Sequence, residues 1–311
     1  MYNVLSLFDG ISCGQVALQR AGMKVSKYYA SEIDKHAITI TQKNHPDTLQ
    51  LGDVTKWREW DLPNIDILFA GFPCQAWSMA GKQKGESDPR GALVHTLIDI
   101  WKHYKPKYFL FENVKMKKEF AEYIDNLFGV PHIEINSALV SAQNRVRWYW
   151  TNIPNVTQPA DREIYLADII EDDGYFTDRN KSYCIDDNYY KSGNADQYFN
   201  KSRRQLVFKG LACDIKGFDN RRRVYGTEGK SPTLLAASGG HSEPKIAVDG
   251  LKYRKLAPLE CERLQTLPDD YTLVLDENGK QLVSNTQRYK ALGNGWTVDV
   301  IAYILQGLTN D

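Results

Sequence analysis

Short apolar runs alternate with segments of helical spacing along the first 111 residues, and this alternation limits the fold more than any other feature. Each run has the length of a buried strand and is followed closely by glycine or an acidic residue. The predicted strands are Asn3–Phe8, Val25–Ala30, Asp66–Phe69 and Tyr108–Phe111. The predicted helices between them are Gln15–Ala21, Asp34–Asn44 and Ala92–His103. The alternation predicts an α/β fold with a central, mostly parallel sheet.

The alternation continues as far as residue 151 and resumes at the end of the chain. A further helix is expected near Lys117–Phe128, followed by two adjacent strands, Ile133–Leu139 and Val146–Thr151. Near the end of the chain, a loop containing Gly293 and Gly295 precedes a predicted helix, Thr297–Leu308. The last helix therefore looks like a return of the chain to the first domain.

A single cysteine follows the predicted strand Asp66–Phe69, within the sequence Ala-Gly-Phe-Pro-Cys-Gln-Ala-Trp-Ser. Pro73 cannot continue the strand, so Cys74 is expected on a loop at its carboxyl end. In open α/β sheets, ligands and reactive groups collect at that edge. A buried structural cysteine is the more common explanation when such a residue stands alone.

Two further segments change that balance for Cys74. The strand Tyr108–Phe111 is followed by Glu112, which places a carboxyl group at a second strand end. In the segment Gln-Asn-Arg-Val-Arg that begins at residue 143, Arg145 and Arg147 share one face of an extended chain. The three segments together supply a nucleophile, an acid and cationic hydrogen-bond donors.

The beginning of the chain has a pattern typical of nucleotide-like cofactor sites, in which a strand, a glycine turn and a helix follow one another. A purely structural tight turn explains the same pattern. Glu32 follows the second strand, where a carboxylate accepts hydrogen bonds from ribose, or it caps the next helix. Asp53 is placed to receive an adenine amino group, or it simply forms a turn.

Composition excludes several classes of protein. The formal net charge of the 311 residues is zero, so no global charge announces a nucleic-acid partner. The five cysteines are scattered, without a CxxC pair, which argues against a disulfide framework and a structural zinc site, and no metal is predicted. No signal peptide and no apolar run of membrane-spanning length is recognised. A soluble, cytoplasmic protein is expected.

The charge distribution changes after Pro154. Residues 157–198 contain ten acidic and four basic residues, whereas residues 199–255 contain thirteen basic and five acidic residues. The basic part is rich in glycine and strand-like, and it is a credible phosphate-binding surface, although a solvated basic face explains it too. Arg221-Arg222-Arg223 and the loop at Ser238-Gly239 are candidates for reading base edges. A helix over Leu256–Leu267, ended by Pro268, is expected to join the two parts of the chain.

Taken together and in this order, these segments resemble the cytosine-5 DNA methyltransferase family in its compact bacterial or phage form. The resemblance covers most of the chain, except for about residues 157–253. The motifs that carry it are Phe8-x-Gly10-x-x-x-Gly14, Glu32, Asp53, Pro73-Cys74-Gln75, Glu112-Asn113-Val114, Gln143-x-Arg145-x-Arg147, Arg254-x-Leu256-x-Pro258-x-Glu260-x-x-Arg263-Leu264-Gln265 and Gly293-Asn294-Gly295.

The resemblance implies a Rossmann-like, S-adenosyl-L-methionine-dependent methyltransferase domain over residues 1–156 and 285–311. It implies that residues 157–284 form a small target-recognition domain, made mainly of strands and loops, together with the connecting helix. Double-stranded DNA is expected to lie between the two domains, and S-adenosyl-L-homocysteine is the expected product of the cofactor.

The resemblance also assigns roles to individual residues. The implied catalytic residues are Cys74, Glu112, Arg145 and Arg147. The implied cofactor-binding residues are Phe8, Asp9, Gly10, Ile11, Gly14, Glu32, Ile33, Asp53, Val54, Gly71, Pro73, Asn294, Gly295 and Trp296. The residues expected to contact DNA are Gln75, Ser78, Arg221, Arg222, Arg223, Ser238 and Gly239. Three residues depart from the usual pattern of the family: Ser12 replaces a glycine, Ile33 an aromatic residue and Trp296 an aliphatic residue.

The implied chemistry begins with the addition of the Cys74 thiolate to carbon 6 of cytosine, which turns carbon 5 into a nucleophile. If burial keeps Glu112 protonated, its carboxyl group can give a proton or hydrogen bond to ring nitrogen 3, while Arg147 holds the ring carbonyl oxygen. No residue is assigned as the base that removes the carbon-5 proton. Because the reacting carbons are stacked in a duplex, the cytosine must be flipped out, and we expect the loop 76–90 to close behind it.

Three other interpretations are weighed against this one. An RNA-methylating branch of the same family would use the same chemistry, and a catalytically silent DNA-binding regulator would keep the fold. A nicotinamide oxidoreductase would share only the first strand–glycine–helix unit. The resemblance further implies a monomer associated with the nucleoid, which serves restriction–modification or phage self-protection beside a separately acting restriction endonuclease.

Overall fold

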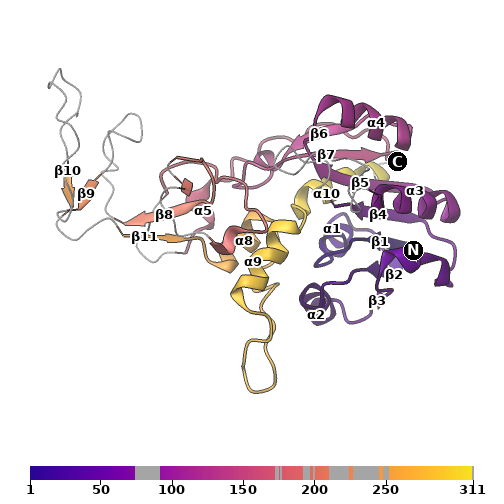
Figure 1. Cartoon of the computed structure of the whole chain (residues 1–311), viewed down its shortest axis with the longest axis horizontal. Coiled ribbons are helices and arrows are strands. Elements are labelled where there is room, and N and C mark those ends of the chain that lie inside the picture. Colours follow the sequence, from indigo (N-terminus) through magenta and orange to yellow (C-terminus); the bar gives the residue numbers. More distant parts are fainter. Residues whose placement is uncertain are drawn as a thin grey trace.

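The computed structural model of the chain consists of a sheet domain and a more extended part that reaches away from it (Figure 1). The structure describes residues 1–73, 92–171, 175, 177–191, 197–198, 200–209, 224–226, 245–247 and 252–309. Within these residues, no helix is both long and apolar enough to cross a lipid bilayer.

The sheet domain is built on a seven-stranded sheet with the order β3-β2-β1-β4-β5-β7-β6. The strands from β3 to β5 in this order run parallel, and β7 and β6 are antiparallel to their neighbours. The bounds are β1 Tyr2–Leu7, β2 Val25–Ser31, β3 Leu49–Gln50, β4 Ile67–Gly71, β5 Tyr108–Val114, β6 Ile133–Asn136 and β7 Val146–Thr151. The mostly parallel α/β sheet predicted from the alternation is confirmed.

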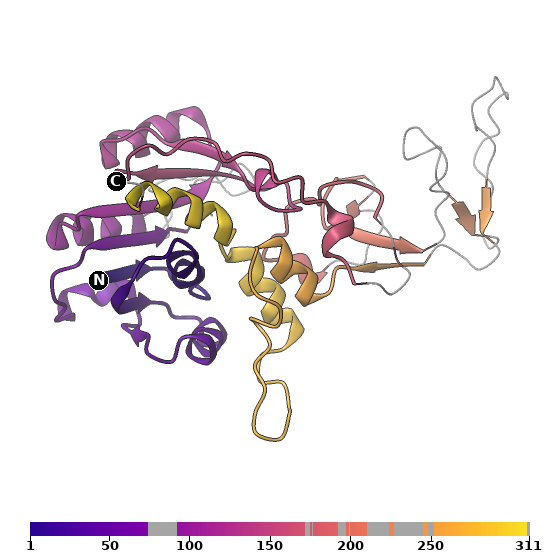
Figure 2. The same ribbon diagram turned by 180° about the vertical axis from the view of Figure 1, so that it is seen from behind.

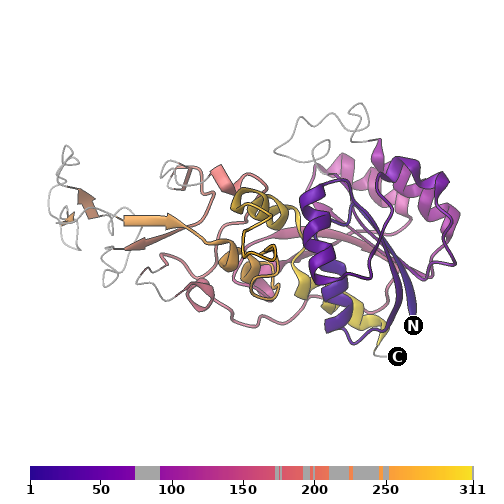
Figure 3. The ribbon, with the colours of Figure 1, turned by 90° about the horizontal axis from the view of Figure 1, so that it is seen from below.

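Helices cover both faces of this sheet (Figure 3). Adjacent residues of a strand point to opposite faces, so Phe69 joins the core beneath one layer of helices and Leu68 the core beneath the other. The first layer contains α1 Cys13–Arg20, α2 Lys35–Asn44 and α10 Val298–Leu305. The second contains α3 Leu93–Tyr104 and α4 Lys118–Phe128.

The last helix closes the sheet domain, as the sequence predicts. Helix α10 packs against α1, and Figure 2 shows the two side by side. Arg20 of α1 reaches across the contact, with its Nη1 atom 2.5 Å from Oδ1 of Asp299. Arg162 holds the other oxygen of that carboxylate at 2.6 Å. Residues from both ends of the chain therefore form one layer of the sheet domain.

The extended part contains shorter elements. β8 Leu206–Lys209 pairs antiparallel with β11 Lys252–Lys255, and β9 Val224–Gly226 pairs parallel with β10 Lys245–Ala247. Helix α5 Leu166–Ile169 lies near this part, and α8 Pro258–Leu264 and α9 Asn285–Asn294 lie between it and the sheet domain (Figure 1).

Some predicted boundaries are wrong. The helix predicted over residues 256–267 is only α8, because the chain turns at Thr266, whose φ is 52°, before it reaches Pro268. The strand predicted over residues 133–139 ends at Asn136, whose side chain accepts a bond from the Ala138 N–H and begins a 3₁₀ turn. The predicted last helix, residues 297–308, is the α-helix α10 followed by a 3₁₀ turn, Gln306–Leu308.

Helix α9 was missed, because the sequence around Gly293 reads as a glycine loop. Gly293 instead lies inside the helix, where a Cβ atom would stand 2.3 Å from the backbone carbon of Asp186. Packing against residues 186–187 therefore overrides the low helix propensity of glycine at this position.

Candidate active site

The carboxyl ends of β4 and β5 lie side by side at one edge of the sheet. β4 pairs with β5 so that Gly71 lies opposite Glu112, and the Asn113 side chain donates a 3.1 Å hydrogen bond to the carbonyl of Phe72. The chain leaves β4 through Phe72 and Pro73. Cys74 itself lies outside the described residues, and so do Gln75, Ser78 and the rest of the loop 76–90. Phe72, two residues before Cys74, is thus anchored beside the strand that carries Glu112.

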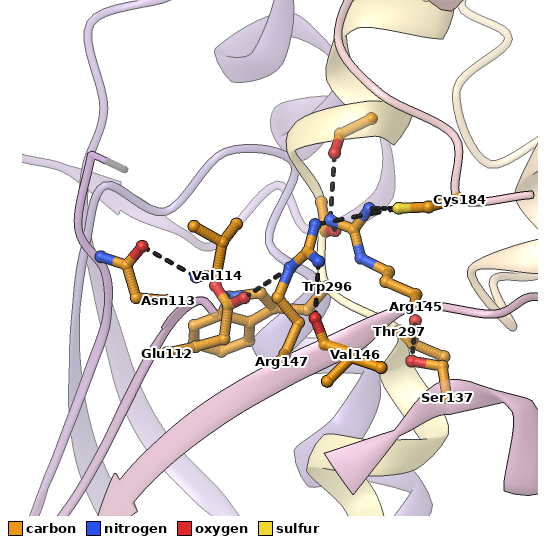
Figure 4. A network of polar contacts seen from close by, with 12 residues as sticks. Glu112, Asn113, Val114, Ser137, Arg145, Val146, Arg147, Cys184, Trp296 and Thr297 are labelled. Carbon is orange, nitrogen blue, oxygen red and sulfur yellow. Dashed lines mark hydrogen bonds and ion pairs between the residues drawn. The ribbon is translucent and has the colours of Figure 1, made fainter. Parts of the chain in front are cut away.

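The carboxyl group of Glu112 is held at both oxygen atoms (Figure 4). Arg147 lies on the antiparallel neighbour β7, and its Nε atom is 3.0 Å from Oε1 of Glu112. The indole Nε1 of Trp296 donates to Oε2 at 3.1 Å. Glu112 is only 8% exposed, so the pair is largely screened from water. The acid and the cation named in the sequence analysis are therefore in direct contact across the paired strands β5 and β7.

Arg145 lies two residues before Arg147 and serves a different set of atoms. Its Nη2 donates to the carbonyls of Gly293 and Gly295 at 3.0 and 2.9 Å, and its Nη1 donates to the Ile185 carbonyl at 3.1 Å. The residue is buried, with 4% of its surface exposed. The geometry favours a role in fixing the end of α9, rather than the catalytic role that the resemblance implies.

Cys184 joins the two arginines, and the sequence offered no signal for it. Its sulfur accepts from Nη1 of Arg145 at 3.4 Å and lies 4.0 Å from Nη2 of Arg147. Burial raises the pKa of the Cys184 thiol, but the two positive charges outweigh that effect and lower the pKa below its ordinary value. The thiol is thus part of the support beneath Arg147.

A second group of predicted residues surrounds the turn between β1 and α1. The backbone of this turn is left-handed at Phe8, Gly10 and Ser12, with φ angles of 56°, 61° and 56°. Glu32, just beyond β2, accepts from the Gly10 N–H at 2.8 Å and from the N–H groups of Ile33 and Asp34 at 2.7 and 2.8 Å. The helix-capping alternative for Glu32 does not apply, because Asp34 is the N-cap of α2.

Asp9 lies at the centre of the same turn. Its carboxyl oxygens accept from the hydroxyl of Tyr28 at 2.8 Å and from the hydroxyl of Ser12. Burial raises the pKa of Asp9 to about 6, and the charge of Glu32 acts in the same direction. Ser12 stands where the family usually has a glycine, and its hydroxyl donates a hydrogen bond to this carboxyl group.

The remaining predicted cofactor residues extend the group along the sheet edge. Asp53 is exposed and caps the 3₁₀ helix Val54–Glu59 by accepting from the N–H and hydroxyl of Thr55, each at 2.9 Å. These hydrogen bonds lower the pKa of Asp53. Ile33 is 75% exposed. Asn294 ends α9, and a Cβ atom at Gly295 would stand 3.3 Å from Sγ of Cys13.

The other predicted cofactor residues support these turns. Ile11 is buried and its carbonyl accepts from Tyr271, and a Cβ atom at Gly14 would stand 2.9 Å from the Phe69 ring.

The DNA-contacting residues proposed from sequence, Arg221, Arg222, Arg223, Ser238 and Gly239, lie outside the described residues. Among the residues that are described, no three His, Cys, Asp or Glu side chains cluster as metal ligands would.

Comparison of the sequence with known proteins identifies the family and relatives of the chain. The family model described as C-5 cytosine-specific DNA methylase matches residues 2–310. The chain is 31% identical to the type II methyltransferase M.HhaI of Haemophilus parahaemolyticus, over 96% of this chain and 92% of the relative. It is 30% identical to the type II methyltransferase M.NlaX of Neisseria lactamica, over 98% of this chain and 96% of the relative.

Solved structures with the same fold are more distant in sequence. The Entamoeba histolytica methyltransferase EhMeth superposes with a TM-score of 0.67 at 17% identity, covering 100% of this chain and 98% of that one. A Spodoptera frugiperda DNMT2 mutant superposes with a TM-score of 0.65 at 20% identity over the full length of both chains. These neighbours establish the Rossmann-like arrangement of the sheet domain.

Proposed function

We propose a residue-level mechanism for this chain, which belongs to the C-5 cytosine-specific DNA methylase family and is a DNA (cytosine-5) methyltransferase. In this proposal Cys74 is the nucleophile, Glu112 and Arg147 act on the target ring, and S-adenosyl-L-methionine is the methyl donor. The observation that supports it most strongly is the buried contact between Glu112 and Arg147, beside the strand end that leads into Cys74.

The catalytic steps follow from these three side chains. The Cys74 sulfur bonds to carbon 6 of cytosine, and the ring's electrons move toward carbon 5. The carboxyl group of Glu112 hydrogen-bonds to ring nitrogen 3 and withdraws charge from the ring, while Arg147 holds the ring carbonyl. After carbon 5 has taken up the methyl group and lost its proton, the carbon–sulfur bond breaks and the Cys74 thiolate leaves. Arg145 supports Arg147 and α9 from behind, without contact to the ring.

The residues around the β1–α1 turn fit the proposed cofactor. Glu32 accepts from three backbone N–H groups in two turns, and Asp9 adds a carboxyl group beside a left-handed backbone. Acceptors of this kind suit ribose hydroxyls and a cationic amino group, and exposed Ile33 suits the face of a purine ring. When bound, the cofactor supplies an electrophilic methyl group. We propose that Asp9 and Gly10 contact its methionine end, Glu32 its ribose and Asp53 its adenine.

The proposal extends to DNA. Residues 1–156 and 285–311 form the catalytic domain, and residues 157–284 form the target-recognition domain with its connecting helix. The target cytosine is flipped from the duplex into the site, at a cost of a few kcal/mol, and the loop 76–90 closes behind it. Basic residues of the segment 199–255, Arg221–Arg223 above all, contact phosphates or base edges. The enzyme acts as a cytoplasmic, nucleoid-associated monomer, in restriction–modification or phage self-protection beside a separate endonuclease.

A trapping experiment tests this mechanism. The protein is incubated with labelled S-adenosyl-L-methionine and duplex DNA, or RNA, and transfer of label is measured. Once bisulfite sequencing has given the target site, an oligonucleotide with 5-fluorocytosine at that site should form a stable adduct, because fluorine cannot leave as a proton does. Peptide mapping should place the adduct on Cys74. Label on RNA alone, or an adduct at another residue, would overturn the proposal.

A further inference from the structure

We propose that Trp296 is a positioning residue for Glu112, whose carboxyl group it fixes through the indole N–H from the side opposite Arg147. This inference deepens the proposed function, since it rests on the catalytic role of Glu112. The resemblance to the family assigns Trp296 only to the cofactor pocket. The geometry points to the carboxyl group instead.

Glu112 is the point where two donors from distant parts of the chain meet (Figure 4). Arg147 Nε lies 3.0 Å from one carboxyl oxygen, and Trp296 Nε1 lies 3.1 Å from the other. A carboxyl group bound at only one oxygen can rotate about the bond to its side chain, whereas one bound at both oxygens cannot. The indole N–H therefore fixes the direction in which Glu112 offers its remaining hydrogen-bonding capacity.

The strand β4 is shaped to admit the indole ring. A Cβ atom at Gly71 would stand 3.0 Å from Nε1 and 3.5 Å from Cε2 of Trp296. Phe69, which shares a strand face with Gly71, makes an edge contact with the indole at 5.9 Å between ring centroids. The missing side chain at Gly71 is thus the space through which the ring reaches Glu112.

The backbone on both sides of Trp296 is held by buried hydrogen bonds. The Gly295 carbonyl accepts from Arg145 at 2.9 Å and from Gln265 Nε2 at 3.1 Å. The Thr297 hydroxyl donates to Gln265 Oε1 and accepts from Ser137, each at 2.9 Å. The backbone that carries the indole is therefore held in place, and the indole N–H in turn holds the carboxyl group of Glu112.

This arrangement matters because rates depend steeply on alignment. A catalytic group displaced by about 1 Å can cost about a hundredfold in rate. Loss of the indole N–H should slow the chemical step and leave the binding of both substrates unchanged. A residue that merely lined the cofactor pocket would have the opposite signature, a raised KM for S-adenosyl-L-methionine at constant kcat.

The test replaces the indole of Trp296 by β-(3-benzothienyl)alanine, which has nearly the same shape but sulfur in place of the N–H group. We expect kcat to fall about tenfold, with KM for DNA and for S-adenosyl-L-methionine unchanged. Trp148 provides the matched control, since its Nε1 donates to the carboxylate of Glu134 at 2.8 Å on the other face of β7. The same replacement at Trp148 should leave kcat at the wild-type value.

Gly71→Ala gives a second, independent measurement should the first variant fold poorly. The added methyl group must displace the indole, so kcat should fall in the presence of Trp296. In a Trp296→Phe background the shorter ring leaves space, and Gly71→Ala should then have little further effect. Additive losses from the two substitutions would show that Gly71 and Trp296 act separately, against the proposal.

The outcomes separate this inference from the proposed function. Wild-type kcat in the benzothienyl variant, or a loss confined to KM for S-adenosyl-L-methionine, would overturn the positioning role of Trp296 alone. Failure of the wild-type protein to form the 5-fluorocytosine adduct would overturn the proposed function, whatever Trp296 does. An adduct that forms in both proteins, but more slowly in the variant, is the expected result.

Discussion

Two carboxyl groups at strand ends of the same sheet are held in opposite ways. Glu32, after β2, binds three backbone N–H groups, two of them from the next two residues of the chain. Glu112, near the end of β5, binds two side chains that lie 35 and 184 residues further along the sequence. The carboxylate of Glu32 stabilises the backbone of turns, whereas that of Glu112 is oriented by side chains from other elements. The turns around Glu32 are thus held mainly by nearby backbone, whereas the carboxyl group of Glu112 is held by side chains from distant segments.

The largest expected effect belongs to Cys74, because neither carboxyl group can take over the role of the nucleophile. Cys74→Ser should abolish methyl transfer, by more than about a thousandfold, because a serine hydroxyl is a poor nucleophile at neutral pH. Binding of S-adenosyl-L-methionine, measured by calorimetry, should stay near the wild-type value because the Glu32 region is intact. Wild-type turnover of this variant would exclude a covalent mechanism.

The next effect tests the catalytic side of the comparison. Glu112→Gln keeps the shape of the side chain but replaces the carboxyl group by an amide, which cannot exchange a proton with the ring. We expect kcat to fall by about a hundredfold or more, and Kd for DNA to change far less. Single-turnover kinetics and DNA binding are the measurements. Glu134→Gln is the control, since that carboxylate lies on β6 and accepts from Trp148. Equal losses in rate and in DNA affinity would favour a structural role for Glu112.

A smaller effect with the opposite signature is expected at the other carboxylate. In Glu32→Gln the side chain keeps only one acceptor oxygen for the N–H groups of Gly10, Ile33 and Asp34. The turn should loosen, and KM for S-adenosyl-L-methionine should rise about tenfold while kcat stays within about threefold. Steady-state kinetics at saturating DNA measure both constants. If Glu32→Gln and Glu112→Gln gave the same pattern of loss, the two regions would not be functionally distinct.

The contrast between the regions also explains what the sequence can predict. Strand lengths, helical periodicity and the turn after β1 are local properties, so the mostly parallel sheet was predicted correctly. The pairing of β5 with β7, which brings Arg147 to Glu112, was not predicted. The contact between Trp296 and Glu112 spans 184 residues and leaves no periodic trace in the sequence. Cys184 and the carbonyl contacts of Arg145 could not be predicted either, because they also join distant segments. In the sequence, Arg145 fits the family motif just as a catalytic residue would.

The last expected effect is on stability rather than on turnover: a pH dependence of the free energy of unfolding within the Glu32 region. Burial and the nearby charge of Glu32 raise the pKa of Asp9 from 3.8 to about 6 in the folded protein. Between these two values the folded protein binds a proton that the unfolded chain has lost. The free energy of unfolding should therefore fall as the pH rises from about 4 to about 6, by up to about 3 kcal/mol from this group.

Asp9→Asn should remove this part of the pH dependence, because the amide does not titrate. Urea unfolding of wild type and variant at several pH values measures the difference. Asp53→Asn is a control of opposite sign: hydrogen bonds from Thr55 lower the pKa of Asp53, so its small contribution to stability is present near neutral pH and lost on acidification. Parallel stability curves for wild type and Asp9→Asn would mean that Asp9 is solvated like an ordinary surface carboxylate. The turn after β1 would then lack the buried acid that distinguishes it from the region around Glu112.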